Sequence, residues 1–280
     1  MSYADLLPPS WKTVVSAWLQ EDCPSFDWGG FVVGNGERTA SLWAKSRGVL
    51  AGVPFVDAIF EELGCRVAWH FREGEVVGEP GGKVHVATVS GPVRRLLLGE
   101  RVALNTLARC SGIASASREM HDAARAAGYR GIVAGTRKTT PGFRLVEKYG
   151  MIVGGVDAHR YDLSSMVMLK DNHVWSTGSI SAAVAAARRV AGFSLRIDVE
   201  VRSYAEAEEA VRAGADVVML DNMEGDELIA CAERLRANLA DYRFLIESSG
   251  GITLRTLADG HVHNGASYSL LLCADQLSTL

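Results

Sequence analysis

Positively charged side chains occur in closely spaced groups in the middle of this sequence. Arg137 and Lys138 are adjacent, His159 and Arg160 are adjacent, and Lys170 follows a short apolar run. Arginine binds carboxylates and phosphates through a planar fork of N–H donors, whereas lysine binds them as a point charge. A lysine that closes a buried strand also needs a partner or a ligand, because an unpaired buried charge is costly. These groups predict a binding site for a small molecule with several negative charges.

Carboxylates and a glycine-rich turn follow comparable apolar runs further along the chain. Glu200 lies between two valines, Asp221 ends a second apolar run, and Ser249, Gly250 and Gly251 follow a third. The backbone N–H groups of such a turn can bind a phosphate. One rim would therefore carry cations, two carboxylates and a glycine turn, which suits an enzyme for a multiply anionic substrate.

Each group also has a simpler structural interpretation, and the residues alone leave both open. Arg101 could be solvated or could pair with Glu100, and Asp221 with Asn222 could cap a helix as readily as take part in catalysis. Lys170 could instead form a Schiff base with a carbonyl substrate, as in an aldolase-like barrel. The pattern thus indicates an enzyme without naming its reaction.

Composition and charge limit the classes of function. The chain has 280 residues, of which 48% are hydrophobic and 22% charged, as in an ordinary globular protein with a large core. Its 29 Lys and Arg against 33 Asp and Glu give a net charge of −4, so we expect no binding to nucleic acid or to a membrane surface. Residues 94–170 nevertheless contain 13 Lys and Arg against 6 Asp and Glu, which concentrates positive charge near the candidate site.

Other features of the sequence predict a cytoplasmic protein. No apolar run approaches the roughly 18 residues of a membrane-spanning helix. The first nine residues contain Asp5 and no basic residue, unlike a signal or transit peptide. The 5 cysteines are widely separated and form no C-x-x-C pair, so we expect buried thiols rather than disulfides or a zinc cluster.

The first part of the chain predicts an α/β module followed by a long helix. Residues 1–91 mix amphipathic helices with strand-like runs. Residues 92–128 have the pattern of a helix that begins at a proline and ends at Gly128, with a break near Ser111-Gly112. The predicted helices and strands of the module are 11–20, 40–45, 55–63, 66–71 and 83–89.

From residue 129 onward, short apolar runs alternate with amphipathic helices. Repeated strand–helix units imply parallel strands buried on both faces, and their number favours a barrel or open barrel over a small doubly wound sheet. In such barrels the reactive residues lie at the carboxyl ends of the strands. Ser203 and Glu206 form a predicted capping box. The apolar runs are 132–134, 166–169, 195–201, 216–220 and 244–246, and the helices are 181–191, 203–213 and 226–239.

A longer series of short motifs connects these groups. The segment Gly135 to Arg144 has the sequence Gly-Thr-Arg-Lys-Thr-Thr-Pro-Gly-Phe-Arg, and Glu-Lys-Tyr-Gly follows at 147–150. Further motifs are Glu100 to Asn105, His159-Arg160, Lys170 to His173, Val199 to Val201, Leu220 to Asn222 and Ser249 to Ile252. In this order, as far as Leu254, the series resembles the quinolinate phosphoribosyltransferase family, most closely its animal members.

The resemblance implies a decarboxylating transfer in NAD synthesis. Quinolinate and phosphoribosyl pyrophosphate would give nicotinate mononucleotide, pyrophosphate and CO2, with Mg2+ bound mainly through the donor and with no organic cofactor. It implies an α/β fold with an N-terminal α/β sandwich over 1–91, a helical connection over 92–128 and an open, TIM-like α/β barrel of parallel strands over 129–280. Members of the family pair head to tail, so we expect a homodimer or a larger assembly up to a hexamer.

The functional residues of the family match positions in this chain. By resemblance, Lys138, Glu200 and Asp221 are the catalytic residues, and Glu200 and Asp221 also bind the ribose hydroxyls and magnesium. The expected substrate-binding residues are Arg101, Arg137, His159, Arg160, Lys170, Ser249, Gly250 and Gly251. Arg101 would reach into the site of the neighbouring subunit, and the turn 249–251 would hold a phosphate.

The resemblance ends after Leu254. The family continues with a strand whose small residues help to bind phosphate, whereas residues 255–280 do not align with that segment. Loss of a barrel strand would expose the edge of its neighbour and remove a phosphate contact. The alternative hypothesis is therefore a catalytically weak chain that binds quinolinate or assembles with intact subunits. Pyrophosphate release compared with quinolinate binding would distinguish the two.

Overall fold

The chain folds into two compact units in a computed structural model that describes residues 2–79, 81–223, 225–258 and 270–271. Unit 1 comprises Met1–Arg118 with Thr140–Gly155. Unit 2 comprises Glu119–Thr139 with Val156–Thr279.

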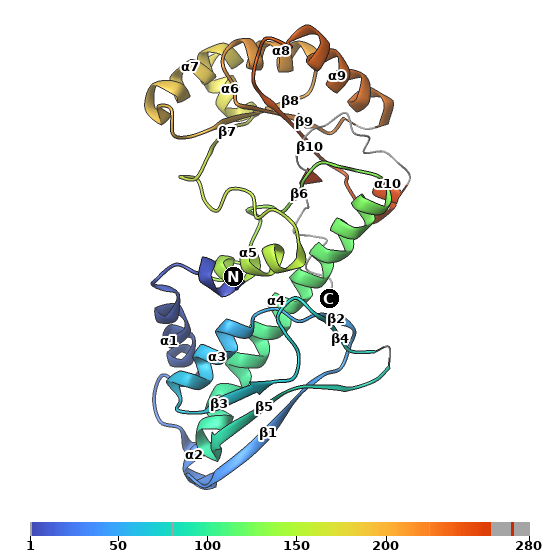
Figure 1. The fold of residues 1–280 in the computed structure, drawn as a ribbon. Coiled ribbons are helices and arrows are strands. Elements are labelled where there is room, and N and C mark those ends of the chain that lie inside the picture. Colours follow the sequence, from blue (N-terminus) through green and yellow to red (C-terminus); the bar gives the residue numbers. More distant parts are fainter. Residues whose placement is uncertain (1, 80, 224, 259–269, 272–280) are drawn as a thin grey trace. The chain divides into compact units, whose positions relative to one another are not determined.

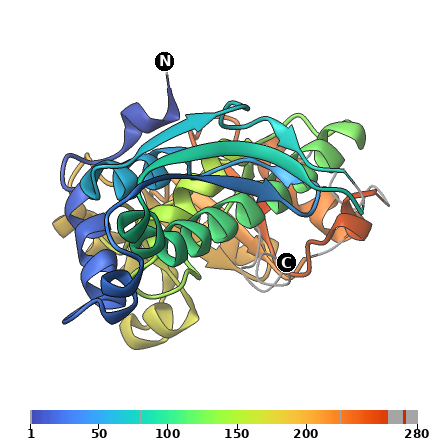
Figure 2. The same cartoon turned by 90° about the horizontal axis from the view of Figure 1, so that it is seen from below.

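Unit 1 is built on a three-stranded antiparallel sheet. Its elements are the 3-10 helix η1 (Tyr3–Leu6), α1 (Trp11–Asp22), α2 (Trp28–Val33), β1 (Glu37–Ala44), β2 (Gly48–Val49), α3 (Val53–Glu62), β3 (Arg66–Trp69), β4 (Val76–Val77), β5 (Val84–Pro92), the first part of α4 (Val93–Ala126) and α5 (Arg144–Gly154). In the sheet, β5 lies between β1 and β3, and β2 pairs separately with β4. Helices α3 and α4 cover the same face of the sheet (Figures 1 and 2).

The core of unit 1 forms around the fully buried Phe55 on α3. Its ring meets the rings of Trp11, Trp18 and Tyr149 edge-on, with centroids 5.6, 6.1 and 5.3 Å away. Offset and edge-on aromatic pairs add stability beyond the apolar area that they bury. The α1, α3 and α5 helices are therefore joined at one point.

The predicted break in the long helix is wrong, because α4 is continuous from Val93 to Ala126. Ser111 lies inside this helix, where its hydroxyl accepts a hydrogen bond from the Ala51 N–H and donates one to the Ala51 carbonyl, both at 3.0 Å. The serine thus binds the segment before α3 and does not end the helix. Tertiary contacts of this kind override weak local preferences.

Glu73 joins three segments of unit 1. Its Oε1 accepts hydrogen bonds from the N–H groups of Gly52 at 2.7 Å and Val53 at 3.1 Å, at the start of α3. Its Oε2 accepts one from the hydroxyl of Tyr149 on α5. Burial raises the pKa of Glu73 above its ordinary value of 4.5, although these hydrogen bonds act in the opposite direction.

We expect the free energy of unfolding to decrease as the pH rises through the raised pKa of Glu73. The folded state favours the protonated carboxyl, so its contribution is complete below the unfolded pKa and is lost as the folded carboxyl ionises. Glu73→Gln resembles the neutral form and should weaken this dependence in urea unfolding from acidic to neutral pH. Glu21→Gln, at an exposed position on α1, controls for the loss of one charge. Equal pH dependence in the wild type and Glu73→Gln would contradict the prediction.

Unit 2 is an open α/β barrel. Its elements are the end of α4, β6 (Val133–Ala134), β7 (Val167–Leu169), α6 (Asp171–Thr177), α7 (Ile180–Ala191), β8 (Ile197–Val201), α8 (Tyr204–Arg212), β9 (Val217–Asp221), α9 (Gly225–Asn238), β10 (Leu245–Ser249), α10 (Leu254–Ala258) and β11 (Leu270–Leu271). The strands form a parallel sheet in the order β6-β11-β10-β9-β8-β7, with α7, α8 and α9 on its outer side (Figure 1). Across the described residues β6 and β7 form no ladder with each other, so the barrel is open. This architecture confirms the predicted fold class, an N-terminal sheet module and a C-terminal α/β unit with parallel strands.

A barrel strand is present after Leu254, a point that the sequence left open. Strand β11 lies between β10 and β6, where Leu270 pairs with Ser248 and Val133. Residues 255–258 of the tail belong to α10, and residues 259–269 and 272–280 lie outside the described residues.

The predicted capping box at the start of α8 is half formed. The Ser203 hydroxyl accepts a hydrogen bond from the Glu206 N–H at 3.2 Å, as expected for a helix cap. The Glu206 carboxylate accepts instead from the N–H of Arg202 at 2.7 Å, one residue before the cap. The helix is thereby fixed to the end of β8.

One face of the barrel strands packs against the helices. Val199, Val201, Val218, Leu220 and Ile246 are buried in one cluster with apolar residues of α7, α8 and α9. Successive side chains of a strand point to opposite faces, so the residues between these point into the barrel. The apolar outer face therefore fixes the positions of the side chains on the inner face.

Candidate active site

The inner face of four neighbouring strands carries four of the candidate residues. Those at or next to the carboxyl ends of β7, β8, β9 and β10 are Lys170, Glu200, Asp221 and Ser249, in that order. Two residues earlier on the same strands are Met168, Asp198, Met219 and Glu247. The two-residue period of the strands thus brings together groups that are far apart in the sequence.

Lys170 and Glu200 form an ion pair at the rim of the barrel, with Nζ 2.6 Å from Oε2. The Lys170 side chain is 47% exposed and that of Glu200 is 11% exposed. Such a lysine differs from the desolvated, unpaired lysine that forms a Schiff base. Burial raises the pKa of Asp221 above 3.8, and the negative charge of Glu200 acts in the same direction. The two carboxylates therefore lie close enough to repel each other.

Asn222 and the glycine turn shape the rim beside Asp221. Asn222 has a left-handed φ of 55°, its N–H donates to the Ser249 carbonyl at 2.9 Å, and its Nδ2 donates to Asp221 Oδ2 at 2.7 Å. Gly250 and Gly251 have φ of 100° and 63°. A Cβ on Gly250 would lie 2.3 Å from Asn222 Oδ1. Position 250 therefore needs a glycine, because glycine adopts a positive φ without strain and has no Cβ to collide with Asn222.

His159 and Arg160 reach the barrel interior from the segment after α5. His159 Nε2 lies 3.2 Å from Oε1 and 3.3 Å from Oε2 of Glu247. Arg160 Nη2 lies 3.2 Å from Sδ of Met168. Burial lowers the pKa of Arg160, and the positive charge of Arg137 acts in the same direction. Two guanidinium groups therefore influence each other in this interior.

Asp198 is fully buried on β8. Neither of its carboxylate oxygens accepts a hydrogen bond from the described residues. Burial raises the pKa of Asp198 well above 3.8, and the negative charge of Glu247 adds to this shift. The motifs did not single out Asp198 or Glu247. A signal was present, because each lies two residues before a candidate residue, Glu200 or Ser249, and shares its face of the strand.

A hollow of about 740 Å³ adjoins these charged groups. Its lining includes His159, Arg160 and Glu247, and also Val217 and Leu245 at the amino ends of β9 and β10. The histidine and the arginine thus lie deeper in the barrel than the lysine and carboxylates of the rim. The rim residues Lys170, Glu200 and Asp221 do not line this hollow, so the charged rim and the hollow are neighbouring features of the barrel.

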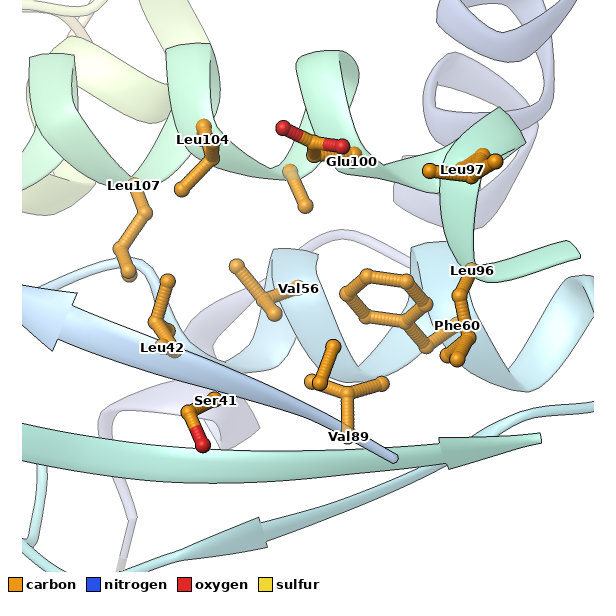
Figure 3. Close-up of a pocket in the computed structure, with 12 residues that line it drawn as sticks. Ser41, Leu42, Val56, Phe60, Val89, Leu96, Leu97, Glu100, Leu104 and Leu107 are labelled. Carbon is orange, nitrogen blue, oxygen red and sulfur yellow. The ribbon is translucent and has the colours of Figure 1, made fainter. Parts of the chain in front are cut away.

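A second cavity, of about 290 Å³, lies in unit 1 between α3, α4 and the sheet (Figure 3). The close-up shows apolar side chains such as Val56, Phe60, Leu104 and Leu107 lining it. Glu100 is its charged lining residue. An apolar cavity beside a carboxylate does not suit an anionic molecule, so unit 2 holds the candidate active site.

The other candidate residues lie on a turn and on a helix. Arg137 and Lys138 follow β6, where the Lys138 N–H donates to the Thr136 hydroxyl at 3.2 Å. Arg137 is half-buried, and its Nε has no hydrogen-bond partner among the described residues. Lys138 is exposed in unit 2, and Arg101 is exposed on α4 in unit 1.

Metal, thiol and membrane features are limited within the part of the chain that the structure describes. No three His, Cys, Asp or Glu side chains there gather in a group that could hold a metal ion. None of the helices described is long and apolar enough to cross a membrane. Cys65, Cys110 and Cys231 are buried free thiols, as predicted, whereas Cys23 is partly exposed. Cys273 lies outside the described residues.

An open α/β barrel with charged groups at the carboxyl ends of its strands is the architecture of an enzyme. Residues 27–111 match the family profile "Quinolinate phosphoribosyl transferase, N-terminal domain". Residues 113–268 match the profile of the C-terminal domain of the same family. The chain belongs to the quinolinate phosphoribosyl transferase family, which confirms the resemblance found in the motifs.

Relatives extend this similarity over most of the chain. Nicotinate-nucleotide pyrophosphorylase [carboxylating] of Homo sapiens is 54% identical over 253 residues, covering 90% of this chain and 84% of the relative. The protein of the same name from Dictyostelium discoideum is 45% identical over 270 residues, covering 92% and 89%. The crystal structure of NadC from Streptococcus pyogenes matches with a TM-score of 0.84 and 36% identity, covering 98% of this chain and 93% of that one. Because the family profile reaches residue 268, the predicted end of the similarity at Leu254 is too early.

We expect Gly250→Ala to destabilise the protein more than Gly178→Ala does. Gly250 and Gly178 have similar φ values of 100° and 90°, so each alanine adds backbone strain of about 1–2 kcal/mol. Only Gly250 closely approaches a neighbour, since no atom lies within 4 Å of a Cβ built on Gly178. Urea unfolding of both variants measures the difference. Equal losses of stability would contradict the close contact between Gly250 and Asn222.

Proposed function

We propose that this protein transfers the phosphoribosyl group of phosphoribosyl pyrophosphate to quinolinate. The products are nicotinate mononucleotide, pyrophosphate and CO2, in a decarboxylating step of NAD synthesis. The observation that carries the proposal is the charged barrel interior. There Lys170 forms an ion pair with Glu200, and His159 contacts Glu247. It occurs in a chain 54% identical to a human nicotinate-nucleotide pyrophosphorylase.

The cations of unit 2 would bind quinolinate, which carries carboxylates on two adjacent ring carbons. Arg137 has a buried Nε without a hydrogen-bond partner among the described residues, and its charge acts on Arg160. A dicarboxylate would compensate two neighbouring guanidinium groups through forked hydrogen bonds. His159 and Lys170 would add donors, and Arg101 of a neighbouring subunit would add a further positive charge.

The phosphoribosyl donor would bind at the rim. The turn 249–251 would hold a phosphate through its backbone N–H groups. Lys138, exposed after β6, would be shared between the donor and quinolinate. Glu200 and Asp221, on adjacent strands, would accept hydrogen bonds from the ribose hydroxyls.

Magnesium fits the donor set of this rim. Mg2+ prefers oxygen ligands and is often bound by one or two carboxylates together with substrate phosphates. Glu200 and Asp221 would hold it. Burial raises the pKa of Asp221, and the nearby negative charge of Glu200 adds to the shift, as expected where two carboxylates lie close together. When bound, the ion would neutralise charge on the pyrophosphate.

Catalysis would rest on the stabilisation of charge and needs no covalent nucleophile or organic cofactor. As pyrophosphate leaves, positive charge develops on the ribose, and Glu200 and Asp221 stabilise it. Lys138 balances the negative charge of the leaving group. The ribosylated pyridine nitrogen is positive, so it stabilises the carbanion that forms when the adjacent carboxylate leaves as CO2. This carbon then takes a proton from solvent, which gives nicotinate mononucleotide.

We further propose that the protein works as a homodimer or a larger assembly, up to a hexamer, in the cytoplasm. The exposed position of Arg101 on α4 is suited to reach the site of a neighbouring subunit. The free thiols Cys65, Cys110 and Cys231 fit a reducing compartment.

The release of CO2 from carboxyl-labelled quinolinate tests the proposed reaction. We expect release only when phosphoribosyl pyrophosphate and Mg2+ are both present, and each is omitted in parallel. Quinolinate binding without release would support the alternative, a catalytically weak chain. A chain that neither binds quinolinate nor releases CO2 would reject the proposed function.

We expect Glu200→Gln to reduce kcat by about 100-fold, because it removes the negative charge that stabilises the developing positive charge on the ribose. The KM for quinolinate should change little. Steady-state kinetics measures both constants, with Glu227→Gln, at an exposed position on α9, as the control. An unchanged kcat would remove Glu200 from the assigned role.

A further inference from the structure

A carboxylate and an imidazole form a buried pair inside the barrel. The side chain of Glu247 is 3% exposed and that of His159 is 9% exposed. His159 Nε2 lies 3.2 and 3.3 Å from the two carboxylate oxygens. Glu247 points inward from β10, two residues before the turn that begins at Ser249. The pair therefore lies just below the rim of the candidate active site.

The backbone of His159 is held independently of this pair. Asp157 forms a parallel bridge with Ala134 on β6, donating its N–H to the Val133 carbonyl at 2.8 Å and accepting from the Gly135 N–H at 2.7 Å. The Asp157 carboxylate accepts a hydrogen bond from the N–H of His159, which has a left-handed φ of 56°. These bonds fix the main chain of His159 on the barrel. They do not fix the orientation of its imidazole ring, which needs a separate contact.

The contact with Glu247 decides the roles of the two ring nitrogens. A carboxylate only accepts hydrogen bonds, so Nε2 must carry a proton to bind it. Nδ1 has no hydrogen-bond partner among the described residues, which leaves it as the nitrogen available to a ligand. In histidine sites the hydrogen bond made by one nitrogen fixes the orientation of the ring and therefore the direction of the other nitrogen.

We propose that Glu247 is a positioning residue, which accepts from His159 Nε2–H and so orients the ring, protonated at both nitrogens, for Nδ1–H to donate to the quinolinate carboxylate. This inference rests on the proposed function, because it assigns His159 to the binding of quinolinate. Glu247 itself touches no substrate in this arrangement. It acts through the orientation and the attraction of the imidazole.

The surrounding charged groups do not replace Glu247. Asp198, on β8, influences Glu247 electrostatically, but its oxygens accept no hydrogen bond from the described residues. The charge of Glu247 also acts on Arg160, but the Nη2 group of Arg160 contacts the sulfur of Met168. Glu247 is therefore the group that orients the ring.

Kinetics of Glu247→Ala and Glu247→Gln tests the proposal. Loss of the acceptor in Glu247→Ala should raise the KM for quinolinate by about 10-fold and leave the KM for phosphoribosyl pyrophosphate unchanged. The amide oxygen of Glu247→Gln can still accept from Nε2–H, so this variant should recover most of the lost affinity. Ile246→Val, the neighbouring residue that packs against the helices, controls for local disturbance of β10.

Two further measurements separate positioning from a general structural effect. Nitrogen NMR of labelled wild-type protein should show His159 protonated at Nε2, and this readout holds even if Glu247→Ala fails to fold. In a His159→Ala background, Glu247→Ala should have no further effect on the KM for quinolinate, because the two residues act as a unit. A neutral ring protonated only at Nδ1, or equal changes in both KM values, would overturn the proposal.

The proposed function and this inference fail in different ways. If the wild-type protein releases no CO2 in the presence of the donor and Mg2+, the function is wrong. If it releases CO2 but Glu247→Ala binds quinolinate as tightly as the wild type in calorimetry, only the role of Glu247 is wrong.

Discussion

Charged side chains that point into the barrel of unit 2 need opposite charges nearby, because an uncompensated buried ion costs several kcal/mol. Lys170 meets Glu200 at the rim, and His159 meets Glu247 below it. Arg160 has a second guanidinium group as its neighbour, which lowers its pKa in addition to the effect of burial. An anionic ligand would complete this balance. Folding of the barrel and recognition of a dicarboxylate are therefore governed by the same electrostatic requirement.

The outer face of the barrel strands contributes to stability, and the inner face carries the charged groups of the candidate site. Residues such as Val199 and Leu220 pack against α7, α8 and α9 and contribute hydrophobic burial. Their neighbours Glu200 and Asp221 point inward and bear the charges of the site. Because the apolar face holds each strand in register, small shifts of the rim are resisted by a whole packed layer. The turn is also held in position, because Gly250 packs so closely against Asn222 that no side chain fits between them.

Many elements follow from local patterns in the sequence. The helices α1 and α7 and the strands β8 and β9 were predicted within a few residues, because periodicity, helix caps and apolar runs are local properties. The prediction of a helix break at Ser111 was wrong because the environment of Ser111 depends on a distant residue. Its hydroxyl binds the main chain of Ala51, 60 residues away, and no local pattern reveals that contact. The strand β11 was missed in the same way, because pairing with β10 and β6 depends on distant partners.

The sequence by itself determined the fold class, the family and the identity of the charged groups, because motif order and the alternation of strands and helices are written along the chain. It indicated Lys170, Glu200 and Asp221 as candidates from their places at the ends of apolar runs. Only the tertiary structure decided that Glu247 meets His159, 88 residues earlier in the chain. Partners, burial and pKa shifts depend on distances between elements. Those distances arise when side chains pack, and no pattern along the sequence records them.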